Sequence, residues 1–311
     1  MLKRNTRAEK NEIDGIIDTI SLKIFDKRQK IKLLLAAMLT GGHVLLEDRP
    51  GLGKTTLALA LAQVFGMDFK RIQFTSDLMP SDVLGVTIYD REKHIFEYHK
   101  GPIFTQFMLA DELNRATPKT QSALLEAMAE KQISIDGKTH PLSPSFFVIA
   151  TQNPLDESGT YPLPDSQLDR FVLSLSLGYP DSKNERKLYS NAYLKAHEQP
   201  LPQQASVKTL MAWQERVQAV YAGDDVLDYL QELINKSRHH TQISIGLSPR
   251  AGLALFRVSQ ALAFIDQRDF VTPADIQEAF YPVARHRLVS NDMNISSNQL
   301  IHGIIDETPI L

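Results

Sequence analysis

A glycine-rich turn in the first fifth of the chain has the residue types and spacing of a P-loop, or Walker A motif. It consists of Arg49-Pro50-Gly51-Leu52-Gly53-Lys54-Thr55-Thr56. In such a loop backbone N–H groups surround phosphate oxygens, the lysine reaches the β- and γ-phosphates, and the following hydroxyl binds Mg²⁺. The whole segment is therefore predicted to bind ATP and Mg²⁺. Asp48 replaces the first glycine of the general pattern, so its carboxylate must point away from the phosphates or be neutralised.

Two acidic residues, Asp111 and Glu112, follow the apolar run 107–110. An ATPase must hold Mg²⁺ and prepare a water molecule for attack. Asp111 is predicted to support the Mg²⁺ shell through water, together with Thr55, and Glu112 to polarise the attacking water. Taken alone, two acids at a strand end are also typical of a solvated strand end. The P-loop upstream favours the catalytic interpretation.

Asn153 follows a third apolar run, 146–151. Ligands collect at the carboxyl ends of parallel strands, so this amide is predicted to reach the γ-phosphate or its water. An asparagine before a proline is also an ordinary turn. Gln152 is a weaker candidate for the same role.

Two arginines are candidates for stabilising charge on the transferring phosphoryl group. Arg170 precedes the last predicted strand and is predicted to act on the nucleotide of another subunit, with a surface pair between Asp169 and Arg170 as the alternative. Arg250 follows Ser248-Pro249, a good N-cap and first helical residue. Because an arginine in the first turn opposes the helix dipole, a functional reason for its position is expected, and a tolerated surface arginine is the alternative.

Several other polar and aromatic residues are predicted to have no chemical role. His94, His99 and the pair His239-His240 lack partner ligands at metal spacing, so they are expected to be solvated or packed. The cluster Arg285-His286-Arg287 is expected to be a solvated helix face or helix end, and Trp213 to be buried in the core.

The apolar pattern predicts an α/β fold around these residues. The strand His43–Glu47 leads into the P-loop, and the loop leads into a helix over 55–65. Further strands are predicted at 69–74, 107–111, 146–151 and 172–177, with helices at 13–24, 31–38 and 119–130. This alternation is typical of a parallel sheet covered by helices. Hairpins are predicted at 86–98 and at 132–142, the second around Asp136-Gly137, and both are expected to project from the sheet.

Strand signals end at Gly178-Tyr179-Pro180 and helical periodicity follows. We therefore predict a P-loop nucleotide-binding core at 1–180 and a small all-α domain at 181–311. The core contains an insert at about 78–100 and the hairpin at about 132–142.

The composition is that of an ordinary globular protein. The chain has 311 residues, of which 43% are hydrophobic and 23% charged, and a net charge of −3. The charge gives no overall reason to bind nucleic acid, and cysteine is absent, as is common in cytosolic proteins. The start of the chain lacks the apolar segment of an export signal, and the longest apolar helical run falls well short of the roughly 20 residues that span a bilayer. A cytoplasmic protein with no transmembrane segment is expected.

Together, these motifs resemble the MoxR family of AAA+ ATPases, over nearly the whole chain. The segments that carry the resemblance are Leu45-Leu46-Glu47-Asp48, Ala110-Asp111-Glu112-Leu113-Asn114-Arg115-Ala116, the helix 120–128, Gly159-Thr160-Tyr161-Pro162-Leu163-Pro164, Leu168-Asp169-Arg170-Phe171 and Ser248-Pro249-Arg250-Ala251. A small departure is Asp165-Ser166, where the family usually has Glu-Ala.

The resemblance implies roles for the candidate residues. Asn153 corresponds to sensor 1, Arg170 to the arginine finger presented to a neighbouring subunit, and Arg250 to sensor 2. Whether Arg250 serves its own nucleotide or that of a neighbour is left open. Asp48 at the first position of the P-loop is then an ordinary feature, because members of the family often have another residue in place of the first glycine. The two hairpins correspond to the helix-2 insert and the pre-sensor-1 hairpin, and the C-terminal helices to the lid.

The resemblance also implies a function: ATP hydrolysis at the subunit interfaces of a homo-oligomeric ring, expected to be a hexamer. The family is similar to chaperones that remodel or mature partner proteins, often together with proteins that carry von Willebrand factor A domains. Two alternatives are a nucleotide-gated assembly scaffold without productive turnover and, with less support, a nucleic-acid motor.

Overall fold

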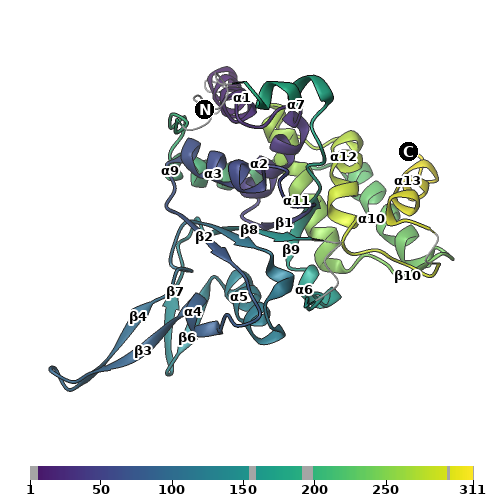
Figure 1. Cartoon of the computed structure of the whole chain (residues 1–311). Helices are drawn as coiled ribbons and strands as arrows, with labels where there is room; N and C mark the ends of the chain where they lie inside the picture. The colour runs from purple at the N-terminus through teal and green to yellow at the C-terminus, as the bar shows by residue number, and fades with distance from the viewer. Residues whose placement is uncertain (1–5, 154–158, 191–198, 293–294, 311) are drawn as a thin grey trace.

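The computed structural model describes residues 6–153, 159–190, 199–292 and 295–310, and a parallel five-stranded sheet lies at its centre (Figure 1). In space the strands follow the order β2-β5-β8-β1-β9, and all four pairings are parallel. Their bounds are β1 His43–Glu47, β2 Phe69–Gln73, β5 Phe107–Asp111, β8 Phe147–Gln152 and β9 Phe171–Leu175. The five predicted strands are confirmed, with shifts of one or two residues at some ends.

Helices cover both faces of the sheet (Figure 1). Residues alternate between the faces along each strand, so Val44 and Leu46 join one apolar cluster and Leu45 joins another. The first cluster includes side chains of α1 Thr6–Ser21, α2 Arg28–Leu39 and α3 Lys54–Phe65. The second includes those of α4 Pro80–Leu84, the short η1 Leu113–Arg115 and α5 Pro118–Glu130, and the short α6 Asp165–Leu168 packs against it. The predicted α/β core is therefore confirmed.

Two hairpins extend away from the sheet at one end of the molecule (Figure 1). They pair β3 Gly85–Asp90 with β4 Ile95–Lys100, and β6 Gln132–Ile135 with β7 Lys138–Pro141. Asp136 and Gly137 both have positive φ, 50° and 73°, the left-handed conformation that an Asp-Gly hairpin turn requires. Both hairpin predictions are confirmed.

The C-terminal part of the chain is helical. Its elements are α7 Ser182–Leu188, α9 Val207–Gln218, α10 Asp224–His239, α11 Pro249–Ile265, α12 Pro273–Ala284 and α13 Ser297–Asp306. It also contains a small antiparallel ladder of β10 Ile243–Ile245 and β11 Val289–Ser290, which the sequence pattern did not predict. Strands of two or three residues are too short to show an alternating pattern.

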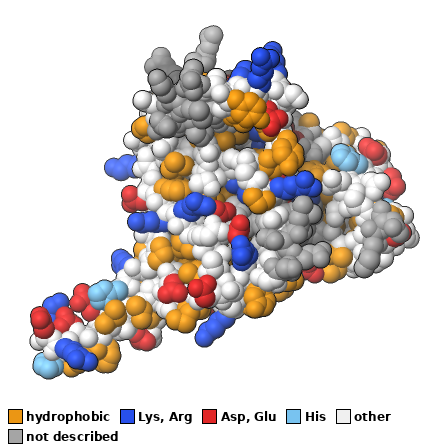
Figure 2. Space-filling model, viewed as in Figure 1, with side chains coloured by type: hydrophobic (Ala, Val, Ile, Leu, Met, Phe, Trp, Pro, Cys, Tyr) orange, Lys and Arg blue, Asp and Glu red, His pale blue; other side chains and the backbone are white. Residues whose placement is uncertain are grey.

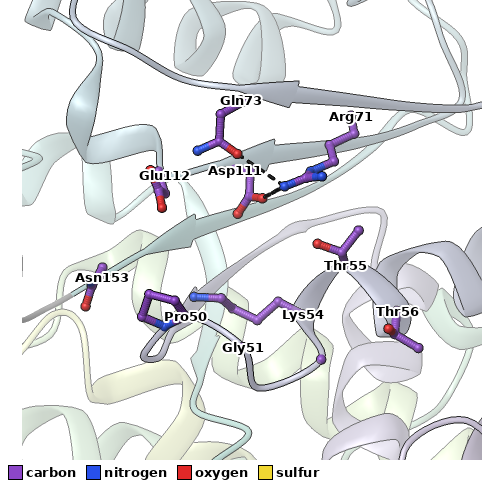
Figure 3. Close-up of a pocket in the computed structure, with 11 residues that line it drawn as sticks. Pro50, Gly51, Lys54, Thr55, Thr56, Arg71, Gln73, Asp111, Glu112 and Asn153 are labelled. Carbon is purple, nitrogen blue, oxygen red and sulfur yellow. Dashed lines mark hydrogen bonds and ion pairs between the residues drawn. The ribbon is translucent and has the colours of Figure 1, made fainter.

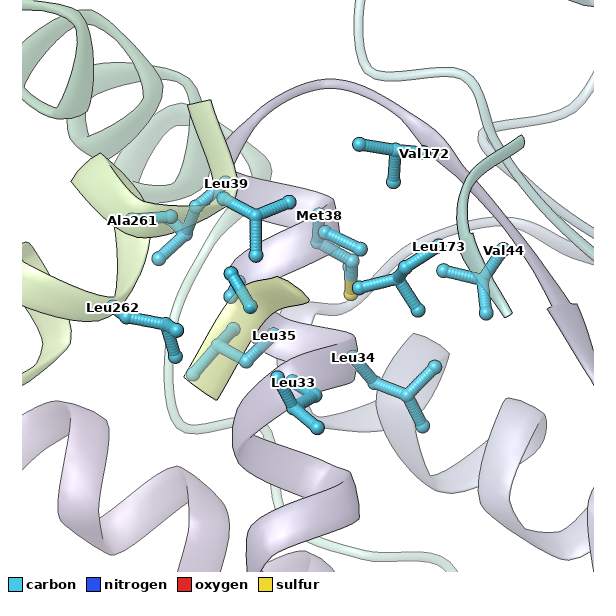
Figure 4. Packing of buried hydrophobic residues seen from close by; sticks show 14 of the residues in the cluster. Leu33, Leu34, Leu35, Met38, Leu39, Val44, Val172, Leu173, Ala261 and Leu262 are labelled. Atoms are coloured by element: carbon cyan, nitrogen blue, oxygen red, sulfur yellow. The ribbon is translucent and has the colours of Figure 1, made fainter. Parts of the chain in front are cut away.

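The helical part packs directly against the core of the sheet domain. Leu35 and Leu39 of α2 lie beside Ala261 and Leu262 of α11 in one buried cluster (Figure 4). Trp213 is buried, as expected, and meets Phe65 of α3 edge-on, with ring centroids 6.4 Å apart. The boundary near Pro180 stays a prediction.

Candidate nucleotide-binding site

The P-loop and the two acids meet because of the strand order. β5, β8 and β1 are neighbours in the parallel sheet, so the segments after their carboxyl ends open on the same edge. A pocket of about 390 Å³ forms there, with Lys54 and Thr55 on one side and Arg71, Gln73 and Asp111 on the other (Figure 3). Its lining consists of Pro50, Gly51, Gly53, Lys54, Thr55, Thr56, Arg71, Gln73, Asp111, Glu112 and Asn153. Most of the predicted nucleotide-binding residues thus share one pocket.

The P-loop turns directly into α3. Gly51 and Gly53 have φ values of 82° and 84°, in the left-handed region that favours glycine. Lys54 is the first residue of the helix, is nearly buried, and donates from Nζ to the backbone oxygen of Asp48 at 2.7 Å. Burial lowers the pKa of Lys54, while the carboxylates of Asp48, Asp111 and Glu112 oppose that shift. A helix N-terminus with a buried ammonium beside it is suited to bind phosphate groups.

The Asp48 carboxylate points away from the phosphate pocket, as its position in the motif required. Oδ1 accepts from Ser176 Oγ at 2.7 Å and from the backbone N–H of Gly178 at 3.2 Å, and Oδ2 accepts from the N–H of Leu177 at 2.5 Å. Asp48 therefore anchors the start of the P-loop to the segment that leaves β9.

A buried threonine orients both acids. Oγ1 of Thr151, on β8, contacts Asp111 on the adjacent strand β5 as well as the backbone of Glu112. Glu112 has a φ of 56°, which turns the chain sharply after the strand, and its carboxylate pairs with Arg115 at 3.0 Å. The Thr151 hydroxyl on the neighbouring strand therefore holds Asp111 by its carboxylate and Glu112 by its backbone N–H.

Arg71 and Gln73 of β2 are pocket residues that the sequence patterns did not single out. Arg71 donates to Oδ2 of Asp111 from Nη2 at 2.7 Å and from Nε at 3.1 Å. Gln73 lies beside Asp111 in the parallel register, where it accepts a bond from Arg71 at 3.2 Å. The only available signal was two polar residues at alternate positions of a predicted strand, and that signal does not identify the neighbouring strand.

A second, more apolar pocket of about 170 Å³ lies beside the first, and Gly51, Gly53 and Thr56 line both. Leu52 of the P-loop also lines it, and residues from the segment after α1 and from the segment after β9 complete it. These are Lys23, Ile24, Phe25, Lys27, Gly178, Pro180 and Leu188. Leu52 thus faces this second pocket, whereas Arg49 is exposed and lines neither pocket.

Arg170 and Arg250 share a third pocket, which we call the basic pocket, of about 210 Å³. Arg257 and Arg287 also line it, and the residues that line it are different from those of the P-loop pocket. Nη1 of Arg170 donates to the backbone oxygen of Leu125 at 2.7 Å. The structure therefore places Asn153 with the P-loop and the two candidate arginines elsewhere.

One alternative and one expectation about charged residues are wrong. Asp169 forms its ion pair with Arg287, Oδ1 to Nε at 2.7 Å, instead of with the adjacent Arg170. His286 and Arg287 are buried, whereas a solvated helix end was expected. The error arises because α12 ends against the start of β9, a contact that sequence periodicity does not reveal.

Burial changes the proton affinities of these two side chains. Burial lowers the pKa of Arg287, and the nearby charge of Arg250 lowers it further, while the hydrogen bond and charge of Asp169 raise it. Burial also holds the pKa of His286 well below its ordinary value, and the charge of Arg287 acts in the same direction. The buried arginine thus depends on Asp169 for charge compensation.

Among the described residues, no group of three or more histidine, cysteine, aspartate or glutamate side chains could hold a metal ion by itself. Thr55 and Asp111 instead offer a hydroxyl and a carboxylate inside the P-loop pocket. Mg²⁺ is usually bound in this way, by one or two carboxylates together with substrate phosphates. In the described part of the chain, no helix has both the length and the apolarity needed to cross a bilayer.

Comparison with known proteins identifies related chains. The model of the ATPase family associated with various cellular activities (AAA) matches residues 43–173, and the AAA lid domain model matches residues 235–304. An uncharacterized protein of Bacillus subtilis, YeaC, is 46% identical over 88% of this chain and 85% of its own length. Chaperone MoxR1 of Mycobacterium tuberculosis is 38% identical over 91% of this chain and 77% of its own length.

A solved structure has the same fold. It is a crystal structure of a proposed ATPase from Cytophaga hutchinsonii, with a TM-score of 0.90 and 37% identity over 99% of this chain and 97% of that one. The likeness extends over both the sheet domain and the helical part.

Proposed function

Because the chain belongs to the MoxR family of AAA+ ATPases and is an ATP hydrolase, we propose that it hydrolyses ATP at interfaces between its own subunits. The observation that carries this proposal is the separation of the candidate residues into two pockets. The P-loop, Glu112 and Asn153 line one, and Arg170 and Arg250 line the other. Each pocket is then half of a complete site, and the second half comes from a neighbour.

The first half binds the nucleotide. Arg49 to Thr56 form the phosphate-binding segment, in which the backbone N–H groups at the start of α3 and the Lys54 ammonium bind the β- and γ-phosphates. The apolar pocket of Ile24, Phe25 and Leu188 takes the base and ribose, since it shares Gly51, Gly53 and Thr56 with the phosphate pocket. ATP thus spans both pockets.

Thr55 and Asp111 would hold Mg²⁺ together with the phosphates, and the bound ion would neutralise charge on the phosphate oxygens. Glu112 accepts the proton of the attacking water as general base, and Asn153 orients that water against the γ-phosphate. Thr151 keeps both acids in place through its hydroxyl.

The second half supplies positive charge to the neighbouring nucleotide. Arg170 stabilises the charge that develops on the transferred phosphoryl group, and Arg250 acts there with it, in trans. This assignment is supported by the shared basic pocket. The sequence left open whether Arg250 serves its own nucleotide or that of a neighbour, and we propose the neighbour because Arg250 lines the same pocket as Arg170.

A site shared between subunits implies a homo-oligomer, and we propose a hexameric ring in the cytoplasm, a location consistent with the absence of cysteine. By analogy with the chaperone MoxR1, we propose that the ring remodels or matures partner proteins. Proteins with von Willebrand factor A domains are the candidate partners that the family resemblance implies. Figure 2 shows positive and negative side chains interspersed over one face, which supports a protein partner over nucleic acid.

Mixed subunits test the intersubunit site. Arg170→Ala and Arg250→Ala are each expected to bind ATP normally and to hydrolyse it at least about tenfold more slowly. Adding Lys54→Ala subunits, which present an intact basic pocket but bind ATP poorly, should restore part of the turnover. Full activity of either arginine variant as a monomer, with no response to Lys54→Ala, would disprove the proposal.

The partner proposal has a separate test. Glu112→Gln should retain ATP without hydrolysing it and so hold a partner long enough for affinity capture, with Lys54→Ala as the matched control. Specific proteins captured only by Glu112→Gln support remodelling. A wild-type turnover no faster than that of Glu112→Gln, with ATP binding intact, identifies a nucleotide-gated scaffold instead.

A further inference from the structure

Asp169 joins three elements at the edge of the basic pocket. Its Oδ1 accepts from Nε of Arg287 at 2.7 Å, and its Oδ2 accepts from Oγ of Ser248 at 3.0 Å. Asp169 precedes β9, Ser248 precedes α11, and Arg287 follows α12. A single carboxylate therefore connects the sheet domain to two helices of the helical part.

The guanidinium of Arg287 is saturated with hydrogen bonds. Besides its contact with Oδ1, it donates to the backbone oxygens of Asp169, Phe171, Val172 and Val283, at distances between 2.5 and 3.2 Å. Its side chain is only 4% exposed. A buried charge with one carboxylate partner requires that partner to stay in position, so Arg287 fixes Asp169 firmly.

Both candidate arginines are next to this network in the chain. Arg170 directly follows Asp169. Arg250 lies in the first turn of α11, whose N-cap Ser248 accepts the N–H of Ala251 at 3.0 Å while donating to Asp169. The Asp169 carboxylate therefore fixes the backbone beside Arg170 directly, and it fixes the backbone of Arg250 through the Ser248 N-cap.

We propose that Asp169 is a positioning residue that, with Arg287 and Ser248, presents Arg170 and Arg250 as one rigid unit to the nucleotide of a neighbouring subunit. This inference rests on the proposed intersubunit site. Charge stabilisation requires donors placed within fractions of an ångström, and long arginine side chains reach such precision only from a fixed backbone. Buried ion pairs often add little net stability, and in some proteins they specify a single arrangement of the parts that they join.

The test compares Asp169→Ala with a matched control. Asp275→Ala removes another aspartate that pairs with an arginine, Arg268, at 2.5 Å; Asp275 is buried and lies outside the basic pocket. Asp169→Ala should bind ATP within about twofold of wild type and lose at least about tenfold in turnover. Asp275→Ala should keep turnover per folded subunit within about twofold.

Mixing with Lys54→Ala distinguishes positioning from general damage. The Lys54→Ala subunit carries an intact Asp169, so it should restore turnover to Asp169→Ala as it does to Arg170→Ala. The double variant Asp169→Ala/Arg170→Ala should be no slower than Arg170→Ala, because both changes disable the same unit. Unchanged turnover of Asp169→Ala, or a loss that Lys54→Ala does not rescue while it rescues Arg170→Ala, overturns the inference.

A failure of the intersubunit proposal gives a different result. In that case Arg170→Ala itself keeps its turnover, or it loses turnover that Lys54→Ala subunits do not restore. If Asp169→Ala does not fold, Ser248→Gly replaces it in the test, because glycine costs little at an N-cap but removes the hydroxyl that contacts Asp169. Ser248→Gly should lose at least about threefold in turnover, with rescue by Lys54→Ala. A wild-type rate for Ser248→Gly overturns the inference in that case.

Discussion

Oγ1 of Thr151 donates a hydrogen bond of 2.7 Å to Oδ1 of Asp111, and the same oxygen accepts the backbone N–H of Glu112 at 2.9 Å. One fully buried hydroxyl on β8 thus sets both the proposed Mg²⁺ ligand and the proposed general base on β5. This contact crosses between adjacent strands, so it also fixes the relation of the acids to Asn153, which follows β8.

We predict that Thr151→Val lowers turnover at least about tenfold and the free energy of unfolding by about 1 to 3 kcal/mol, because Asp111 and the Glu112 N–H lose their partner. Thr151→Ser, which keeps the hydroxyl, should recover most of the turnover. Steady-state hydrolysis and urea unfolding provide the measurements. A fully active Thr151→Val would contradict the positioning role.

Asp48→Gly restores the general P-loop pattern but should destabilise the protein. The substitution removes the carboxylate that accepts hydrogen bonds from Ser176, Leu177 and Gly178, so we expect a loss of about 3 kcal/mol in unfolding free energy. Asp48→Asn should lose less, because its amide oxygen still accepts. Chemical denaturation checks both, and a glycine variant as stable as wild type would show that the anchor is dispensable.

Arg71→Gln should weaken ATP binding about tenfold, because it removes a positive charge from the wall of the phosphate pocket. Arg71→Lys, which keeps the charge, should lose much less affinity. Titration with a fluorescent ATP analogue at several salt concentrations gives the comparison. Equal affinities for wild type and Arg71→Gln would assign Arg71 to the support of Asp111 alone.

His43 should make the protein less stable in mild acid. Its Nδ1 accepts the N–H of Val148 at 3.1 Å and its Nε2 donates to the oxygen of Met128 at 3.2 Å, and burial lowers its pKa to about 4. The unfolded state therefore binds more protons between pH 6.5 and 4, so the unfolding free energy falls as pH falls through that range, by roughly 3 kcal/mol in total.

His43→Gln is the control for this effect. It removes the titrating group, so its unfolding free energy should depend less steeply on pH between 6.5 and 4 than that of wild type. Urea unfolding at a series of pH values measures both slopes, and equal slopes would refute the assignment.

The residues of the P-loop, the two acids and Asn153 were predictable from the sequence by itself, because each chemical group lies within a few residues of the strand that carries it. The alternation of apolar strands and helices predicted the α/β core for the same reason, since side-chain direction along a strand repeats every two residues. The hairpin at Asp136-Gly137 was likewise a local property of two residues with positive φ.

Only the tertiary structure decided which distant groups meet. The strand order β2-β5-β8-β1-β9 brings Arg71 to Asp111 and Thr151 to both acids, and many strand orders are compatible with the same local pattern. Arg287 lies 118 residues from Asp169 in the chain. It was expected to be solvated, and the packing of the helical part against β9 instead buries it in an ion pair with Asp169. Contacts between such distant residues depend on how the helices and strands pack together. The periodicity of one helix or strand shows which of its faces is buried but does not show which element packs against that face.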